Sequence, residues 1–141
     1  DSSALTLRIS TIGRELNSAH GLLDWFLQQQ KSCRGFKNAY FSGLPTVYFA
    51  SILRDIILPN PKLKGLYHIA ADSINKYDLL SLIAKVYRKK IDIVPDENLK
   101  IDRSLNSGKF HKMTGFRSPT WDELINIMYS YEDIGKSVSN V

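Results

Sequence analysis

The chain has 141 residues, of which 43% are hydrophobic, and a formal net charge of +5. This length and composition suit one globular domain. The single cysteine, Cys33, excludes an internal disulfide, and the three histidines lie too far apart in the sequence for a zinc motif. No apolar run approaches the roughly 20 residues that cross a bilayer, and the first residues lack the plan of a secretion signal, so we expect a cytoplasmic protein.

In the first half of the chain the pattern predicts strands and helices in alternation. Residues 4–9 read as a mostly buried strand, and the apolar residues after His20 predict a helix from about 20 to 32, ended by Gly35. Residues 37–42 read as a second strand. Thr46 is then expected to cap a helix over residues 47–58.

The second half continues the alternation. Residues 65–70 predict a strand, and Ser73 is expected to cap the helix that follows, with its apolar stripe at Leu79, Leu80, Ile83, Ala84 and Tyr87. Residues 91–94 predict a short strand, after which Pro95 is expected to begin an irregular passage.

A capping motif predicts where the last helix begins. Thr120 and Glu123 have the spacing of a capping box, and Leu124, Ile125, Met128 and Tyr131 are expected to be its buried stripe. We expect residues 1–134 to form a single α/β domain with short, partly parallel strands and flanking helices, and residues 135–141 to be a frayed tail.

Three neighbouring motifs carry a family resemblance. Residues 101–110 read IDRSLNSGKF, residues 112–116 read KMTGF, and residues 119–124 read PTWDEL. In this order they resemble the C-terminal, substrate-binding part of the dTDP-4-dehydrorhamnose reductases, which belong to the extended short-chain dehydrogenase/reductases. The resemblance implies an NAD(P)-dependent reductase of a nucleotide-linked 4-keto sugar, in deoxysugar and polysaccharide biosynthesis.

Two features that such an enzyme needs are absent from the sequence. The eight glycines never fall in the G-x-x-G-x-x-G spacing that cradles a dinucleotide, and none of the seven tyrosines has a lysine four residues later. We therefore expect the N-terminal Rossmann part to be missing, so that the chain alone has no catalytic residues, no turnover and no tight binding of NADP or NAD.

The resemblance also implies positions for binding residues. It places Ser10, Thr11 and Ile12 beside the nicotinamide carboxamide, although an ordinary strand-to-loop transition would explain them equally. It places Thr46 near the sugar nucleotide, where helix entry is the simpler explanation.

Two further side chains are candidates for substrate binding. Arg103 offers a planar fork of donors for phosphate oxygens, with pairing to Asp102 or a neighbouring carboxylate as the alternative. Trp25 could stack on a base or sugar, or lie in the core, while Lys109 is expected to be a solvated face residue.

A second function class stays open on the basis of charge. A basic chain could be a stand-alone module that binds nucleic acid or a protein partner. Against nucleic acid, the aromatic residues fall in apolar stripes and are not interleaved with Lys and Arg. Because sheet neighbours of residues 5–9 are not expected within this chain, that strand is predicted to expose an edge or to pair with another copy.

Overall fold

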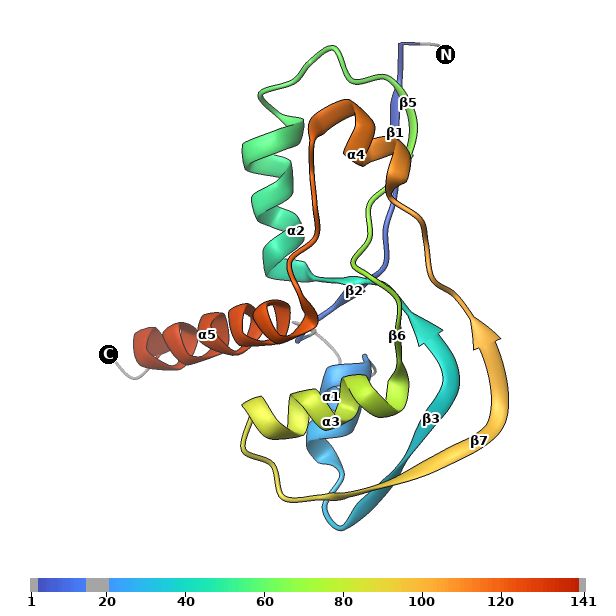
Figure 1. Cartoon of the computed structure of the whole chain (residues 1–141). Helices are drawn as coiled ribbons and strands as arrows, with labels where there is room; N and C mark the ends of the chain where they lie inside the picture. Colours follow the sequence, from blue (N-terminus) through green and yellow to red (C-terminus); the bar gives the residue numbers. More distant parts are fainter. Residues whose placement is uncertain (1–2, 15–20, 140–141) are drawn as a thin grey trace.

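The computed structural model describes residues 3–14 and 21–139, with side chains as far as Glu132. Figure 1 shows two layers, each made of strands and helices, that meet in the middle of the molecule. The long last helix extends from the place where they meet. No helix in this described part is long and apolar enough to span a membrane.

The first layer is built on a parallel pair of strands. β1 (Leu5–Arg8) pairs with β5 (Gly65–His68), so both predicted strands are present. The expectation that the first is mostly buried is wrong, because its residues alternate between half-buried and exposed. Helix α2 (Thr46–Ile52), its continuation η1 (Leu53–Ile57), a π-helical turn, and helix α4 (Gly108–Thr114) pack their apolar residues against this pair. The buried members of this core are Leu44, Ile52, Ile57, Leu63, Tyr67, Ile69, Ala71, Phe110, Phe116 and Leu124.

The second layer is a three-stranded sheet in the order β6-β3-β7. β3 (Ser32–Phe41) pairs in parallel with β7 (Asp92–Asp102) and antiparallel with β6 (Ile74–Asn75). Helices α1 (Leu22–Gln28) and α3 (Lys76–Val86) contribute to the core beside this sheet. Its buried members are Ile12, Leu23, Phe26, Leu79, Leu80, Ile83, Ile125 and Met128.

Two predictions about this sheet are wrong. Gly35 does not end the first helix but lies buried in β3. Glycine is needed at this position because a Cβ would come within 2.9 Å of the Tyr77 Cα on the neighbouring helix. Pro95 does not end a strand, since β7 runs through it to Asp102. β7 is an edge strand, and an edge tolerates a residue that has no N–H to donate.

Of the three N-caps predicted from the sequence, the structure confirms one. The Thr120–Glu123 capping box is confirmed, with the Thr120 N–H bonded to Glu123 and the Glu123 N–H bonded to the Thr120 hydroxyl. Thr46 is not an N-cap, because α2 begins at Thr46 after Pro45. The cap of α3 is Asn75 and not Ser73, since the Asn75 side chain accepts from the Asp78 N–H at 2.8 Å.

Helix α5 (Trp121–Ser139) connects the two layers. Leu124 is buried in the first core and Ile125 and Met128 in the second, as the predicted stripe requires, while Tyr131 is 53% exposed and so was wrongly included. Trp121 packs against both cores. The division at residue 134 stays a prediction, and α5 is helical as far as Ser139.

Candidate functional site

The predicted cofactor segment and Thr46 lie together where the two layers meet. β2 (Thr11–Ile12) pairs in parallel with β4 (Leu44–Pro45), which leads directly into α2. The Thr46 hydroxyl consequently reaches the Ile12 carbonyl, at 3.4 Å. The Leu44 N–H also donates to the Ser10 carbonyl, at 2.9 Å.

The side chains of this segment differ in what they can offer a ligand. Ser10, Thr11 and Thr46 are exposed, so their hydroxyls are accessible. Ile12 is only 4% exposed and belongs to the second core. Any ligand contact at Ile12 must therefore use its main chain, whose carbonyl already accepts from Thr46.

An ion-pair bridge fixes the chain just after this segment. The Arg14 guanidinium contacts Asp24 of α1 at 2.8 Å and Glu132 of α5 at 2.5 Å. Desolvation opposes the charged form, but the hydrogen bonds that Arg14 donates to Glu132 and Asp24 outweigh it and raise the pKa of Arg14. The bridge ties the end of the β2 segment to both helices.

Arg103 lies in a turn whose backbone is fixed on both sides. Its own N–H donates to the Tyr40 carbonyl at 3.2 Å. The neighbouring Asp102 carboxylate accepts from the Ser104 N–H at 2.9 Å and from the Ser104 hydroxyl. These hydrogen bonds lower the pKa of Asp102, and both end on one oxygen of the carboxylate that was the alternative partner of Arg103.

The Arg103 guanidinium itself is exposed. Within residues 3–14 and 21–132 it forms no hydrogen bond or ion pair with another side chain. A planar cation in this state has all five of its N–H donors available to an anionic ligand.

The end of β3 joins the Arg103 turn to the cofactor segment. Ser42, which is 2% exposed, accepts from the Leu105 N–H through its hydroxyl at 2.7 Å and from the Ala71 N–H through its carbonyl at 2.8 Å. Two residues later, Leu44 bonds to Ser10. Ser10, Thr11, Ile12 and Thr46 are thus brought together, and the turn that carries Arg103 is anchored to the same short stretch of chain.

Trp25 does not join this group through any described contact. It lies on α1 and is 39% exposed, whereas its neighbour Phe26 is fully buried in the second core. Of the two alternatives for Trp25, a place in the core is therefore wrong, and its ring faces outward.

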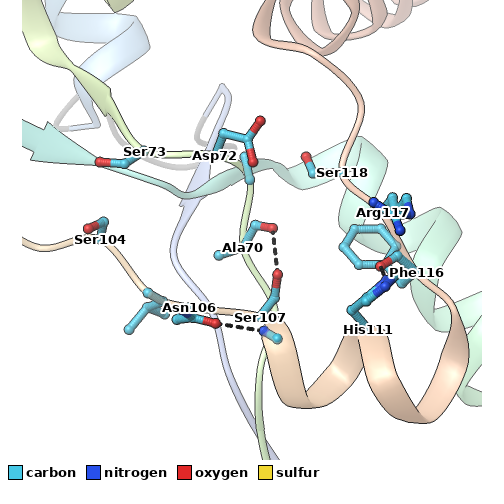
Figure 2. A pocket seen from close by; sticks show the side chains of 13 residues that line it. Ala70, Asp72, Ser73, Ser104, Asn106, Ser107, His111, Phe116, Arg117 and Ser118 are labelled. Atoms are coloured by element: carbon cyan, nitrogen blue, oxygen red, sulfur yellow. Dashed lines mark hydrogen bonds between the residues drawn. The ribbon is translucent and has the colours of Figure 1, made fainter.

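A polar cavity of about 620 Å³ opens beside the Arg103 turn (Figure 2). It is lined by three loops and by the start of α4. The loops are the one after β5, the one between β7 and α4, and the one between α4 and α5. The side chains that carry polar groups into it are Asp72, Ser73, Ser104, Asn106, Ser107, His111, Arg117 and Ser118. This volume lies within the range of small-molecule sites.

Several of these polar groups are held in place by the loops. The Ser107 hydroxyl donates to the Ala70 carbonyl at 3.3 Å, and Asn106 accepts from the Gly108 N–H at 2.7 Å. His111 contacts the Phe116 carbonyl through Nδ1 at 2.8 Å, and because a carbonyl oxygen only accepts, this contact orients the ring. Asp72 is held through its carbonyl, which accepts from the Trp121 indole at 2.7 Å.

The sequence predictions missed this cavity and the role of Ser42. A local signal existed for Asp72 and Ser73, which follow a predicted strand at its carboxyl end, where α/β folds gather their ligand-binding loops. No local signal distinguished Ser42, whose partners lie far away in the sequence.

Comparison with known proteins gives a result at the level of fold. No family model and no curated protein matches the sequence. Among solved structures, the chain is similar to a dTDP-4-dehydrorhamnose reductase from Bacillus anthracis str. Ames in complex with NADP, with a TM-score of 0.75 and 12% identity over 90% of this chain and 48% of that one. The fold is that of about half an extended short-chain dehydrogenase/reductase.

Two further structures agree. A dTDP-4-dehydrorhamnose reductase from Yersinia enterocolitica has a TM-score of 0.67 and 15% identity, over 88% of this chain and 49% of that one. A UDP-N-acetylglucosamine 4-epimerase from Bacillus cereus has a TM-score of 0.68 and 16% identity, over 90% and 47%. The extended short-chain dehydrogenase/reductase fold and its partial coverage, both expected from the motifs, are confirmed.

Proposed function

We propose that this chain is the substrate-binding portion of an NAD(P)-dependent reductase that acts on a nucleotide-linked 4-keto sugar in the cytoplasm, in deoxysugar and polysaccharide biosynthesis. The observation that carries the proposal is the fold, shared over 90% of the chain with a dTDP-4-dehydrorhamnose reductase in complex with NADP. The DRSLNSGKF motif supports it from the sequence side.

Arg103 is the residue we assign to the diphosphate of the sugar nucleotide. Its guanidinium is exposed and has no side-chain partner among the described residues, while its backbone is fixed by Tyr40. A fixed backbone with a free bidentate cation is the arrangement that phosphate oxygens require. We assign the hydroxyl of Thr46 to the same ligand and leave Trp25 as a stacking candidate.

The residues of this chain alone do not fit a nicotinamide dinucleotide. The glycine-rich turn is absent from the sequence, and of the Ser10–Ile12 segment only the first two side chains are exposed. These residues could form one wall beside the nicotinamide ring, with the rest of the site supplied elsewhere. We derive no hydride-transfer step from them.

We propose that the Rossmann part of the enzyme joins the first layer at β1. β1 is hydrogen-bonded to β5 on one side, and no other strand of the described residues pairs with it. The side chains of β1 alternate between half-buried and exposed, and the main-chain groups on its free edge have no partner strand among the described residues. The rest of the sheet is the neighbour that the proposal provides.

The test uses the protein encoded by the complete reading frame. We expect it to oxidise NADPH or NADH only when a nucleotide-linked 4-keto sugar is present, and we expect the 141-residue chain alone to show no turnover. Turnover by the chain alone would contradict the proposal, and so would a complete protein that reduces no nucleotide-linked keto sugar.

The arginine assignment has its own matched control. R103Q in the complete protein is expected to raise the KM for the sugar nucleotide about tenfold or more, as the loss of a charge-assisted phosphate contact implies. R88Q removes an exposed arginine that does not line the cavity and is expected to leave KM unchanged. An equal rise of KM in both variants would show that Arg103 has no specific role in binding the sugar nucleotide.

A further inference from the structure

The two edges of the β1–β5 sheet are chemically different. The Gly65 N–H bonds to the Ala4 carbonyl and the Ile69 N–H bonds to the Arg8 carbonyl, both at 2.9–3.0 Å. In a parallel ladder alternate residues face the partner, so the main-chain groups of Leu66 and His68 point away from β1. They form the outer edge of β5.

A lysine side chain occupies this outer edge. The Lys109 ammonium of α4 donates to the Leu66 carbonyl at 2.8 Å. The same ammonium lies 4.4 Å from the centre of the Tyr67 ring. Two contacts of different kinds, on consecutive residues of one strand, therefore hold the charge in place, although Lys109 is exposed as expected for a residue on a solvated face.

The surroundings of the contact favour one position of the side chain. Phe110, the next residue on α4, is fully buried and packs on Tyr67 with ring centres 6.0 Å apart, so the helix is anchored beside the strand. Gly65 begins β5 with a φ of +92°, and a Cβ there would lie 3.6 Å from the ammonium. The cation consequently covers the start of the exposed edge.

We propose that Lys109 closes the β5 edge to strand addition, so that a further strand can join this sheet only beside β1. A strand added at β5 would have to displace the ammonium from the Leu66 carbonyl and then bury a charge or expel it from the Tyr67 ring. The partner excluded in this way is the β5 edge of a second copy of the chain. The closure does not depend on which ligand the protein binds.

The test compares K109M, which keeps the aliphatic stem and removes the charge, with K112M on the same helix. Lys112 is exposed and makes no described contact with β5, so K112M controls for the loss of one positive charge. Sedimentation velocity over a concentration series gives the association constant. Loss of a charged hydrogen bond and a cation–π contact corresponds to roughly a 10- to 100-fold stronger self-association of K109M.

Amide exchange then shows which edge is involved. In associated K109M the Leu66 and His68 amides are expected to become protected, while K112M and the arginine variant K109R behave as the unmodified chain. Self-association of K109M no stronger than that of K112M would overturn the inference, as would protection that appears only at β1. Should K109M fail to fold, K109Q takes its place in the same comparison, with the same outcomes.

Discussion

The buried hydroxyl of Ser42 accepts a hydrogen bond from the backbone N–H of Leu105, at 2.7 Å. This bond fastens the turn that carries Arg103 to the end of β3. Because the Ser42 carbonyl also accepts from the Ala71 N–H at 2.8 Å, one residue ties together the walls of the cavity and the proposed phosphate site.

Replacing Ser42 is expected to destabilise the protein more than an ordinary surface serine. S42A leaves the Leu105 N–H without its partner in a partly buried place, which costs about 1–3 kcal/mol. S130A on the exposed side of α5 is the control, with an expected change within about 0.5 kcal/mol. Urea unfolding of both variants measures the difference, and equal midpoints would show that the Ser42 bond does not stabilise the turn.

The pKa of Asp102 should depend on Ser104. Hydrogen bonds from the Ser104 side chain and backbone hold the Asp102 pKa below its ordinary value. A depressed carboxyl pKa contributes stability above the unfolded-state value, and that contribution is lost as pH falls through the folded-state value. S104A is therefore expected to raise the Asp102 pKa in a carbon-detected NMR titration.

S107A is the matched control for this titration. The Ser107 hydroxyl donates to the Ala70 carbonyl and does not contact Asp102. An Asp102 pKa that shifts equally in both variants would mean that the cause is a change of the loop and not the loss of one hydrogen bond.

Amide exchange along β1 should alternate in the dilute chain. The β5 ladder engages the N–H groups of Thr6 and Arg8, while those of Leu5 and Leu7 face the open edge. Slow exchange is expected at the first two and fast exchange at the other two. If the chain pairs with another copy through β1, the Leu5 and Leu7 amides become protected as concentration rises, and uniform protection at all concentrations would contradict an open edge.

The capping box of α5 offers a test of local stability. T120A removes the acceptor of the Glu123 N–H and is expected to cost about 1 kcal/mol of unfolding free energy. T120S keeps the hydroxyl and should recover most of that loss. Thermal unfolding of the two variants provides the comparison. If T120S lost as much stability as T120A, the cause would be the missing methyl group and not the missing hydroxyl.

The sequence by itself determined those features whose chemistry is local. A short apolar run was sufficient for β1, alternation for β5, and helical patterns for α3 and for the buried face of α5 apart from Tyr131. The Thr120–Glu123 pair predicted the start of α5 because a capping box involves only residues three apart. The alternation of these elements was enough for a partly parallel α/β fold.

Tertiary structure alone decided the features that depend on distant partners. β7 continues through Pro95 because β3 pairs with it in parallel on both sides of a register shift between Phe36 and Asn38. Position 35 of β3 requires glycine because α3 approaches it too closely for a side chain. The positions of Ser42 and Lys109 follow from the same cause. Their hydrogen-bond partners lie many residues away, so no local pattern could distinguish a fixed buried hydroxyl from a turn serine, or an ammonium on a strand edge from a solvated one.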